Sequence, residues 1–81
     1  MTEDSSAIGS VGILTVGTRG ERGPGEVRIK IRGGSETFIA WSEKPLPKGA
    51  TVLVTEWRGR RTVNVMAWAD DPLDELGDYG A

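Results

Sequence analysis

Apolar and polar side chains alternate along much of this chain, most regularly in residues 26–32, EVRIKIR. Val27, Ile29 and Ile31 occupy every second position, and charged residues fill the positions between them. A period of two places the apolar side chains on one face of a strand and the charged ones on the other. The segment is therefore predicted to form a half-buried strand whose outer face is basic.

Four further segments show strand patterns. Residues 50–57 (ATVLVTEW) and 61–68 (RTVNVMAW) place valine at every second position, and residues 36–42 (ETFIAWS) are aromatic and β-branched. Residues 11–16 (VGILTV) form an apolar run whose glycine permits a bulge or a sharp bend. Together with residues 26–32, these segments predict five strands.

The connecting segments predict antiparallel pairing. The glycine-rich residues 18–25 form a flexible loop, Gly33-Gly34 is a tight-hairpin signal, and Gly59 turns the fourth strand into the fifth. Residues 42–49 (SEKPLPKG) are not expected to continue a strand, because their two prolines lack amide donors.

Five short strands with a longer link between the third and fourth suit a small closed barrel, which leaves no free sheet edge. We expect an all-β fold, a five-stranded OB-type barrel over residues 9–68, with an SH3-like barrel as the alternative. Residues 1–8 and 69–81 are expected to be flexible acidic tails.

Charge is unevenly distributed along the chain. All ten basic residues lie between Arg19 and Arg61, and residues 8–68 contain only five acidic ones. The last thirteen residues carry five acidic side chains and no basic one. In that segment Leu73, Leu76 and Tyr79 are spaced three apart after Pro72. We expect disorder there in isolation. One helical turn is the alternative conformation, and a short motif that docks into a partner's groove is an alternative role.

The composition argues against catalysis and metal binding. The chain has 81 residues with neither cysteine nor histidine, which removes thiolates, most zinc sites and the commonest general base. The acidic C-terminal segment lacks the alternating oxygen ligands and central glycine of an EF-hand loop. We therefore expect no enzymatic activity, no cofactor and no metal.

The location is predicted from two further features. No apolar run reaches the roughly 18 residues of a membrane span. The acidic N-terminus is unlike a signal peptide. The expected location is the cytoplasm, with any membrane association made through a partner.

Several residues resemble the C-terminal soluble domain of NfeD-like proteins. They lie along the predicted barrel, from about residue 9 to residue 66: Gly9, Gly12, GEV (25–27), Gly33, Ala40, KGATVLV (48–54) and RGRRTVNV (58–65). The resemblance implies an OB-fold domain without known catalytic residues. It also implies a partner, a bacterial membrane-scaffold protein of stomatin or flotillin type. The longer members' transmembrane helices and ClpP-like protease domain are not found in this sequence, so neither direct anchoring nor proteolysis is expected.

The basic strand face is the first candidate binding surface. Arg28, Lys30 and Arg32 are expected to dock onto an acidic protein surface or anionic lipid headgroups. The alternative function is single-stranded nucleic-acid binding, in which these cations contact phosphates and Trp41 stacks on a base. A merely solvated outer face is a third interpretation.

The aromatic side chains have two interpretations. Most of the large rings are expected to fill the barrel or cap its end. Trp57 and Trp68 fall at strand ends, where exposure would indicate a protein interface. The candidate binding residues are thus Arg28, Lys30, Arg32, Trp41 and Trp57, with a partner motif at Leu73, Leu76 and Tyr79.

Overall fold

The computed structural model describes residues 7–31 and 33–68, and within these residues it contains seven strands and no α-helix. The strands are β1 (Val11–Val16), β2 (Thr18–Arg19), β3 (Gly25–Ile31), β4 (Gly34–Trp41), β5 (Pro45–Leu46), β6 (Thr51–Gly59) and β7 (Thr62–Ala67). Nothing in the described part of the chain forms a helix that would be long and apolar enough to cross a membrane.

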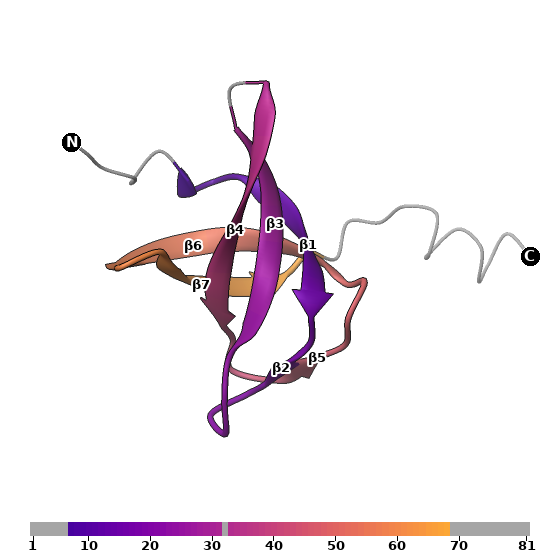
Figure 1. Cartoon of the computed structure of the whole chain (residues 1–81). Helices are drawn as coiled ribbons and strands as arrows, with labels where there is room; N and C mark the ends of the chain where they lie inside the picture. The colour runs from indigo at the N-terminus through magenta and orange to yellow at the C-terminus, as the bar shows by residue number, and fades with distance from the viewer. Residues whose placement is uncertain (1–6, 32, 69–81) are drawn as a thin grey trace, which may run out of the picture.

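The five long strands close into a barrel in the order β1–β3–β4–β7–β6, with β6 returning to β1 (Figure 1). All of these pairs are antiparallel except β4 and β7, which run parallel. Five strands in this closed order form an OB-type barrel. The predicted fold class is therefore confirmed. The predicted strand over residues 11–16 matches β1, and the other four differ from the observed strands by one or two residues at each end.

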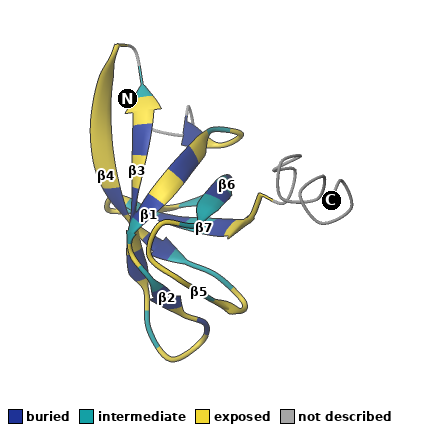
Figure 2. Ribbon diagram, turned by 90° about the vertical axis from the view of Figure 1, so that its right-hand side faces the viewer, coloured by how far each residue is buried: buried dark blue, intermediate teal, exposed yellow. Residues whose placement is uncertain are grey.

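The core follows from the alternation along the strands. Buried and exposed residues alternate on β1 and β3, because successive side chains point to opposite faces (Figure 2). Ten apolar side chains fill the interior: Ala7, Leu14, Val27, Ile29, Phe38, Ala40, Val52, Val54, Val63 and Val65. Ala7 is fully buried, although the sequence predicts it to lie in the flexible N-terminal tail.

Two short strands lie in segments that the sequence predicts as loops. Thr18–Arg19 pairs with Pro45–Leu46 below the barrel (Figure 1). Pro45 is tolerated because the amide of its neighbour Leu46 makes the bond, donating to Thr18 Oγ1 at 2.9 Å. The Thr18 hydroxyl also lies 2.6 Å from Ser42 Oγ. Buried Thr18 therefore ties the two loop segments together.

Glycine allows β1 to approach β3 closely. A Cβ on Gly12 would lie 2.6 Å from the Arg28 carbonyl oxygen, and one on Gly25 would collide with the carbonyl oxygens of Val16 and Gly17. The register between these strands also shifts between Leu14 and Val16. Both features lie where β1 runs along β3, and a bulge of this kind increases the local twist of the strand.

Candidate functional site

The outer faces of β1, β6 and β7 carry exposed apolar side chains. Val11 pairs with Leu53, and Leu53 pairs with Met66, so these three side chains form one row across three strands. Val11 is 44% exposed and Met66 is 51% exposed, and Leu53 between them is half-buried. Their neighbours Val52 and Val65 point inward and are buried.

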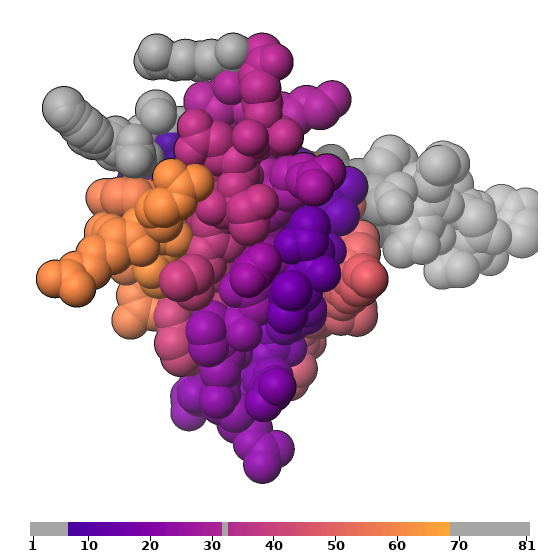
Figure 3. Space-filling view, in the orientation of Figure 1, coloured from indigo at the N-terminus to yellow at the C-terminus, as the bar shows by residue number. Residues whose placement is uncertain are grey.

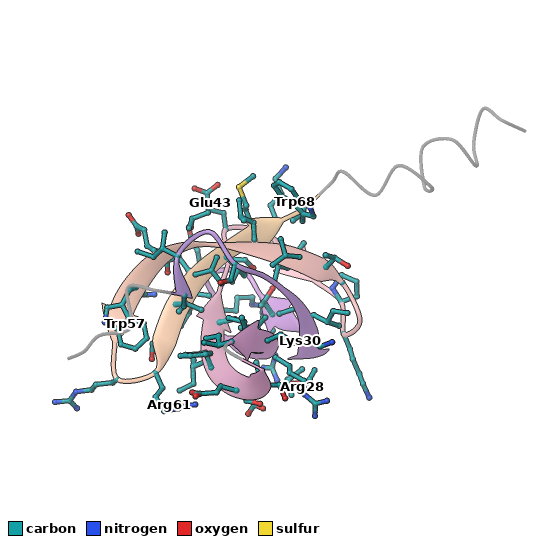
Figure 4. The ribbon with its side chains drawn as sticks, turned by 90° about the horizontal axis from the view of Figure 1, so that it is seen from above. Arg28, Lys30, Glu43, Trp57, Arg61 and Trp68 are labelled. Carbon is teal, nitrogen blue, oxygen red and sulfur yellow. The ribbon has the colours of Figure 1, made fainter. Side chains whose placement is uncertain are left out.

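A second row lies beside the first. Ile13 of β1 pairs with Thr51 of β6, and the Trp68 amide donates to the Thr51 carbonyl at 3.0 Å. Ile13 is 50% exposed and Trp68 is 37% exposed. Trp68 projects from the outside of the barrel, away from the side that carries Arg28 (Figure 4). We call the five side chains Val11, Ile13, Leu53, Met66 and Trp68 the outer apolar patch.

The predicted basic face borders this patch. Arg28 lies opposite Ile13 across the β1–β3 pair. Arg28 and Lys30 are both exposed and point outward from β3, which forms the front of the molecule with β4 and lies beside β1 (Figure 3). An apolar centre with a charged border is the usual composition of a protein–protein interface.

An open groove of about 670 Å³ continues from the patch at Met66. Trp41, Leu46, Arg58 and Asn64 are among the side chains that line the groove. Trp41 is half-buried at the end of β4, on the opposite side of the strand from buried Ala40. The sequence alone left this orientation open.

A cation covers the Trp41 ring. The Arg58 guanidinium lies 5.4 Å from the ring centroid, and its Nη1 donates to Asn64 Oδ1 at 3.3 Å. Asn64 in turn donates from Nδ2 to Glu56 Oε1 at 2.6 Å. One ring face of Trp41 is therefore occupied by a side chain of this chain.

Trp57 lies apart from the other predicted binding residues. It is half-buried against the core, and its ring meets the Phe38 ring edge-on at 6.1 Å between centroids. It sits near the barrel end that also carries Arg61, well away from Lys30 (Figure 4). Its main contact is therefore a packing contact within the domain.

The predicted site residues are only partly brought together. Arg28 and Lys30 share one face of β3, whereas Trp41 lies in the groove and Trp57 at the barrel end. The other four predicted binding residues lie outside the described part of the chain: Arg32, Leu73, Leu76 and Tyr79.

The turn between β6 and β7 has an unusual backbone. Arg60 and Arg61 both adopt left-handed conformations, with φ of 56° and 57°. Such a two-residue turn favours Asn-Gly, because residues with a Cβ are strained at positive φ. The side chain of Arg61 makes contacts that offset this backbone strain. Its Nη2 donates to the Thr37 carbonyl at 2.9 Å and to Glu36 Oε1 at 3.2 Å, and its guanidinium lies 4.9 Å from the Phe38 ring centroid.

The outer apolar patch was not among the predicted sites, although the sequence holds a signal for it. In residues 52–54 (VLV) and 65–68 (VMAW), apolar residues occupy both alternating positions. A strand of this kind is apolar on both faces. In a small barrel only the inner face can be buried, so the second set of apolar side chains must lie outside.

Residues 11–66 match the NfeD C-terminal domain family. The soluble domain of the NfeD protein YuaF from Bacillus subtilis is 26% identical, with a TM-score of 0.68 over 78% of this chain and 75% of that one. The C-terminal domain of stomatin operon partner protein 1510-C from Pyrococcus horikoshii is 23% identical, with a TM-score of 0.62 over 83% of this chain and 95% of that one. No curated protein matches the chain.

Proposed function

Because this chain belongs to the NfeD C-terminal domain family, we propose that it is a non-catalytic adaptor domain that binds a membrane-scaffold protein of stomatin or flotillin type. The observation that carries the proposal is the outer apolar patch, which spans three strands of the barrel. A contiguous exposed apolar surface rimmed by polar residues marks an interaction site in soluble proteins.

The class of partner is supported by one of the similar structures. The Pyrococcus horikoshii domain belongs to a protein named as a stomatin operon partner. At 23% identity the two domains share a fold. We extend the named association of that protein to this chain when we propose a stomatin-type partner. On this proposal the domain reaches the membrane through the scaffold protein.

The border of the patch adds a requirement for the partner. Arg28 and Lys30 are exposed on the β3 side, where they attract acidic groups and steer association. Apolar contacts at the centre supply most of the binding free energy. The expected partner surface therefore has apolar anchors with carboxylates beside them.

Nucleic-acid binding would use the same cations but needs an accessible aromatic ring. Trp41 is half-buried with Arg58 over one ring face, and acidic Glu26 shares the outer face of β3 with the two cations. These contacts favour a protein partner. Salt-reversible NMR shifts at Arg28, Lys30 and Trp41 on titration with a single-stranded oligonucleotide would support nucleic-acid binding instead.

The proposal is tested by measuring the affinity of the full chain for the purified stomatin-type or flotillin-type protein of its native host. Met66→Glu puts a charge in the patch. Ile39→Glu is the matched control, since Ile39 is 41% exposed on the outer face of β4 and outside the patch. Met66→Glu should weaken binding about tenfold or more, and Ile39→Glu by less than about twofold. Equal effects, or no binding by the unmodified chain to either protein, would refute the proposal.

A further inference from the structure

Strand β7 runs further along the barrel than its parallel neighbour β4. Their pairing ends at Trp41 and Asn64, where β4 stops and the chain turns away into residues 42–46. β7 continues to Ala67 and stays paired on its other side with β6, up to the pair of Val52 with Ala67. In the described part of the chain, no strand lies beside the last residues of β7 on the side that β4 has left.

The hydrogen bonds to β6 show which main-chain groups lie on this open side. The Trp68 amide donates to the Thr51 carbonyl of β6 at 3.0 Å. Successive residues of a strand direct their main-chain groups to opposite neighbours, so Met66 also faces β6, whereas Val65 and Ala67 face away from it. The Val65 side chain is buried in the core, so only its main chain can be reached from this side. Val65 and Ala67 therefore form a short free edge of the kind that accepts another strand.

The open groove of about 670 Å³ includes this free edge. Val65 and Ala67 both line the groove. Apolar surface is added by Trp41 from the end of β4, by Leu46 from β5 and by Met66. The volume lies within the usual range of ligand sites, roughly 300–1,000 Å³. A free strand edge beside apolar side chains suits an extended peptide, whose main chain pairs with the edge while its side chains fill the groove.

The charged side chains of the groove favour a basic peptide. Three carboxylates and two cations line it: Glu21, Glu43, Glu56, Lys44 and Arg58. One of the cations, Arg58, already covers the Trp41 ring. Glu21 and Glu43 are exposed, and neither makes an ion pair with another described residue. Lysine or arginine side chains of a peptide can therefore pair with these two carboxylates.

We infer that this groove binds an extended, basic peptide segment of a partner protein, which adds a strand to the free edge of β7. The main chain of the peptide pairs with Val65 and Ala67. Its apolar side chains contact Trp41, and its lysine or arginine side chains pair with Glu21 and Glu43.

This inference goes beyond the adaptor proposal and does not depend on it. The outer apolar patch takes the folded surface of a scaffold protein, whereas the groove takes an extended segment. The two surfaces share Met66 and no other residue. The groove is therefore tested with a free peptide and without substitution of Met66, so that a failure leaves the affinity test with Met66→Glu as a separate result.

A synthetic heptapeptide in which lysine alternates with valine is the probe. It is titrated into the ¹⁵N-labelled full chain, and the inference predicts saturable amide NMR shifts that are largest at Trp41, Val65 and Ala67. The same peptide with its three central amides N-methylated lacks main-chain donors on both edges. It should bind at least about fivefold more weakly. Equal binding of the two peptides, or no saturable shift with the unmethylated one, would refute the inference.

A proline on the free edge tests the same contact from the side of the protein. Ala67→Pro removes an amide that faces away from β6, so the β6–β7 pairing is kept. Ala67→Ser keeps the amide and is the matched control. The proline variant should bind the peptide at least about fivefold more weakly, and the serine variant less than about twofold. Equal peptide affinities in the two variants would contradict strand addition.

The carboxylates are tested by a substitution that leaves the main chain unchanged. Glu43→Lys should weaken binding of the lysine-containing peptide about threefold or more. Glu26→Lys makes the same change of charge on the outer face of β3, outside the groove, and is the matched control. It should weaken binding by less than about 1.5-fold, because exposed charges beyond the contact are screened by salt. Equal effects would mean that the peptide is attracted by overall charge, which would refute a basic peptide site in the groove.

Discussion

Ile13 of β1 and Arg28 of β3 lie directly opposite each other on the outside of the barrel. Ile13 pairs on its other side with Thr51 of β6, where the second row of the outer apolar patch continues to Trp68. The basic face that the EVRIKIR pattern predicts therefore borders an apolar surface. The apolar patch and the basic residues beside it are expected to contribute to binding in different ways, and each contribution can be tested separately.

Removing the basic border should slow association with the scaffold protein. Arg28→Ala combined with Lys30→Ala removes two exposed cations but none of the apolar patch. Border charges act mainly on the association rate, so we expect a fall of about threefold to tenfold at low salt and little change in the dissociation rate. Stopped-flow kinetics over a salt series measures both rates. Arg19→Ala with Arg22→Ala, two exposed arginines outside β3, is the matched control.

A change in the dissociation rate alone would contradict this division of roles. It would indicate that Arg28 and Lys30 make close contacts at the centre of the interface.

The Arg61 side chain should contribute more to the free energy of unfolding than its ion pair with Glu36 alone contributes. Arg61→Ala removes the contact with the Phe38 ring and the bond to the Thr37 carbonyl, so we expect a loss of about 1–2 kcal/mol of unfolding free energy. Glu36→Gln removes only a solvent-exposed ion pair and should cost less than about 0.5 kcal/mol. Urea denaturation followed by tryptophan fluorescence compares the two variants. Equal losses of unfolding free energy in the two variants would mean that the ion pair with Glu36 accounts for the whole contribution of Arg61.

Arg60 offers a stabilising substitution. Its φ of 56° is unfavourable for arginine, and its side chain is exposed. Asparagine tolerates this conformation better, so Arg60→Asn should raise the free energy of unfolding by about 0.5–1 kcal/mol. The same denaturation experiment measures the gain. A less stable variant would show that the Arg60 side chain makes a favourable contact which outweighs the strain.

Gly25 should not accept a side chain. Gly25→Ala places a Cβ against backbone oxygens of residues 16 and 17, which side-chain rearrangement cannot relieve. We expect a loss of about 3 kcal/mol or more, or failure to fold. Gly34→Ala is the control, because its Cβ would lie 3.9 Å from the nearest atom, and it should change stability by less than about 0.5 kcal/mol. Similar stability for the two variants would contradict the close approach of β1 to β3.

Much of the fold could be predicted because the inward positions form a regular pattern. Val27 and Ile29 of β3, with Val52 and Val54 of β6, are buried at alternate positions. The short strand at Pro45–Leu46 could not be predicted, because it depends on a contact with Thr18, which is far away in the sequence.

The candidate site was harder to predict than the fold. Arg28 and Lys30 were identified because their alternation fixes the face on which they lie. Trp41 was ambiguous because a shift of one residue in register reverses its direction. The row of Val11, Leu53 and Met66 exists only after three strands are paired in the correct register.

The most direct test of the proposed function is an amide-resolved NMR titration of the ¹⁵N-labelled full chain with the host's stomatin-type or flotillin-type protein. We expect the largest shifts or losses of signal at Val11, Ile13, Leu53 and Met66. Changes centred instead on Ile39 and Trp41, or no change at any concentration, would contradict the assignment of the outer apolar patch as the docking surface.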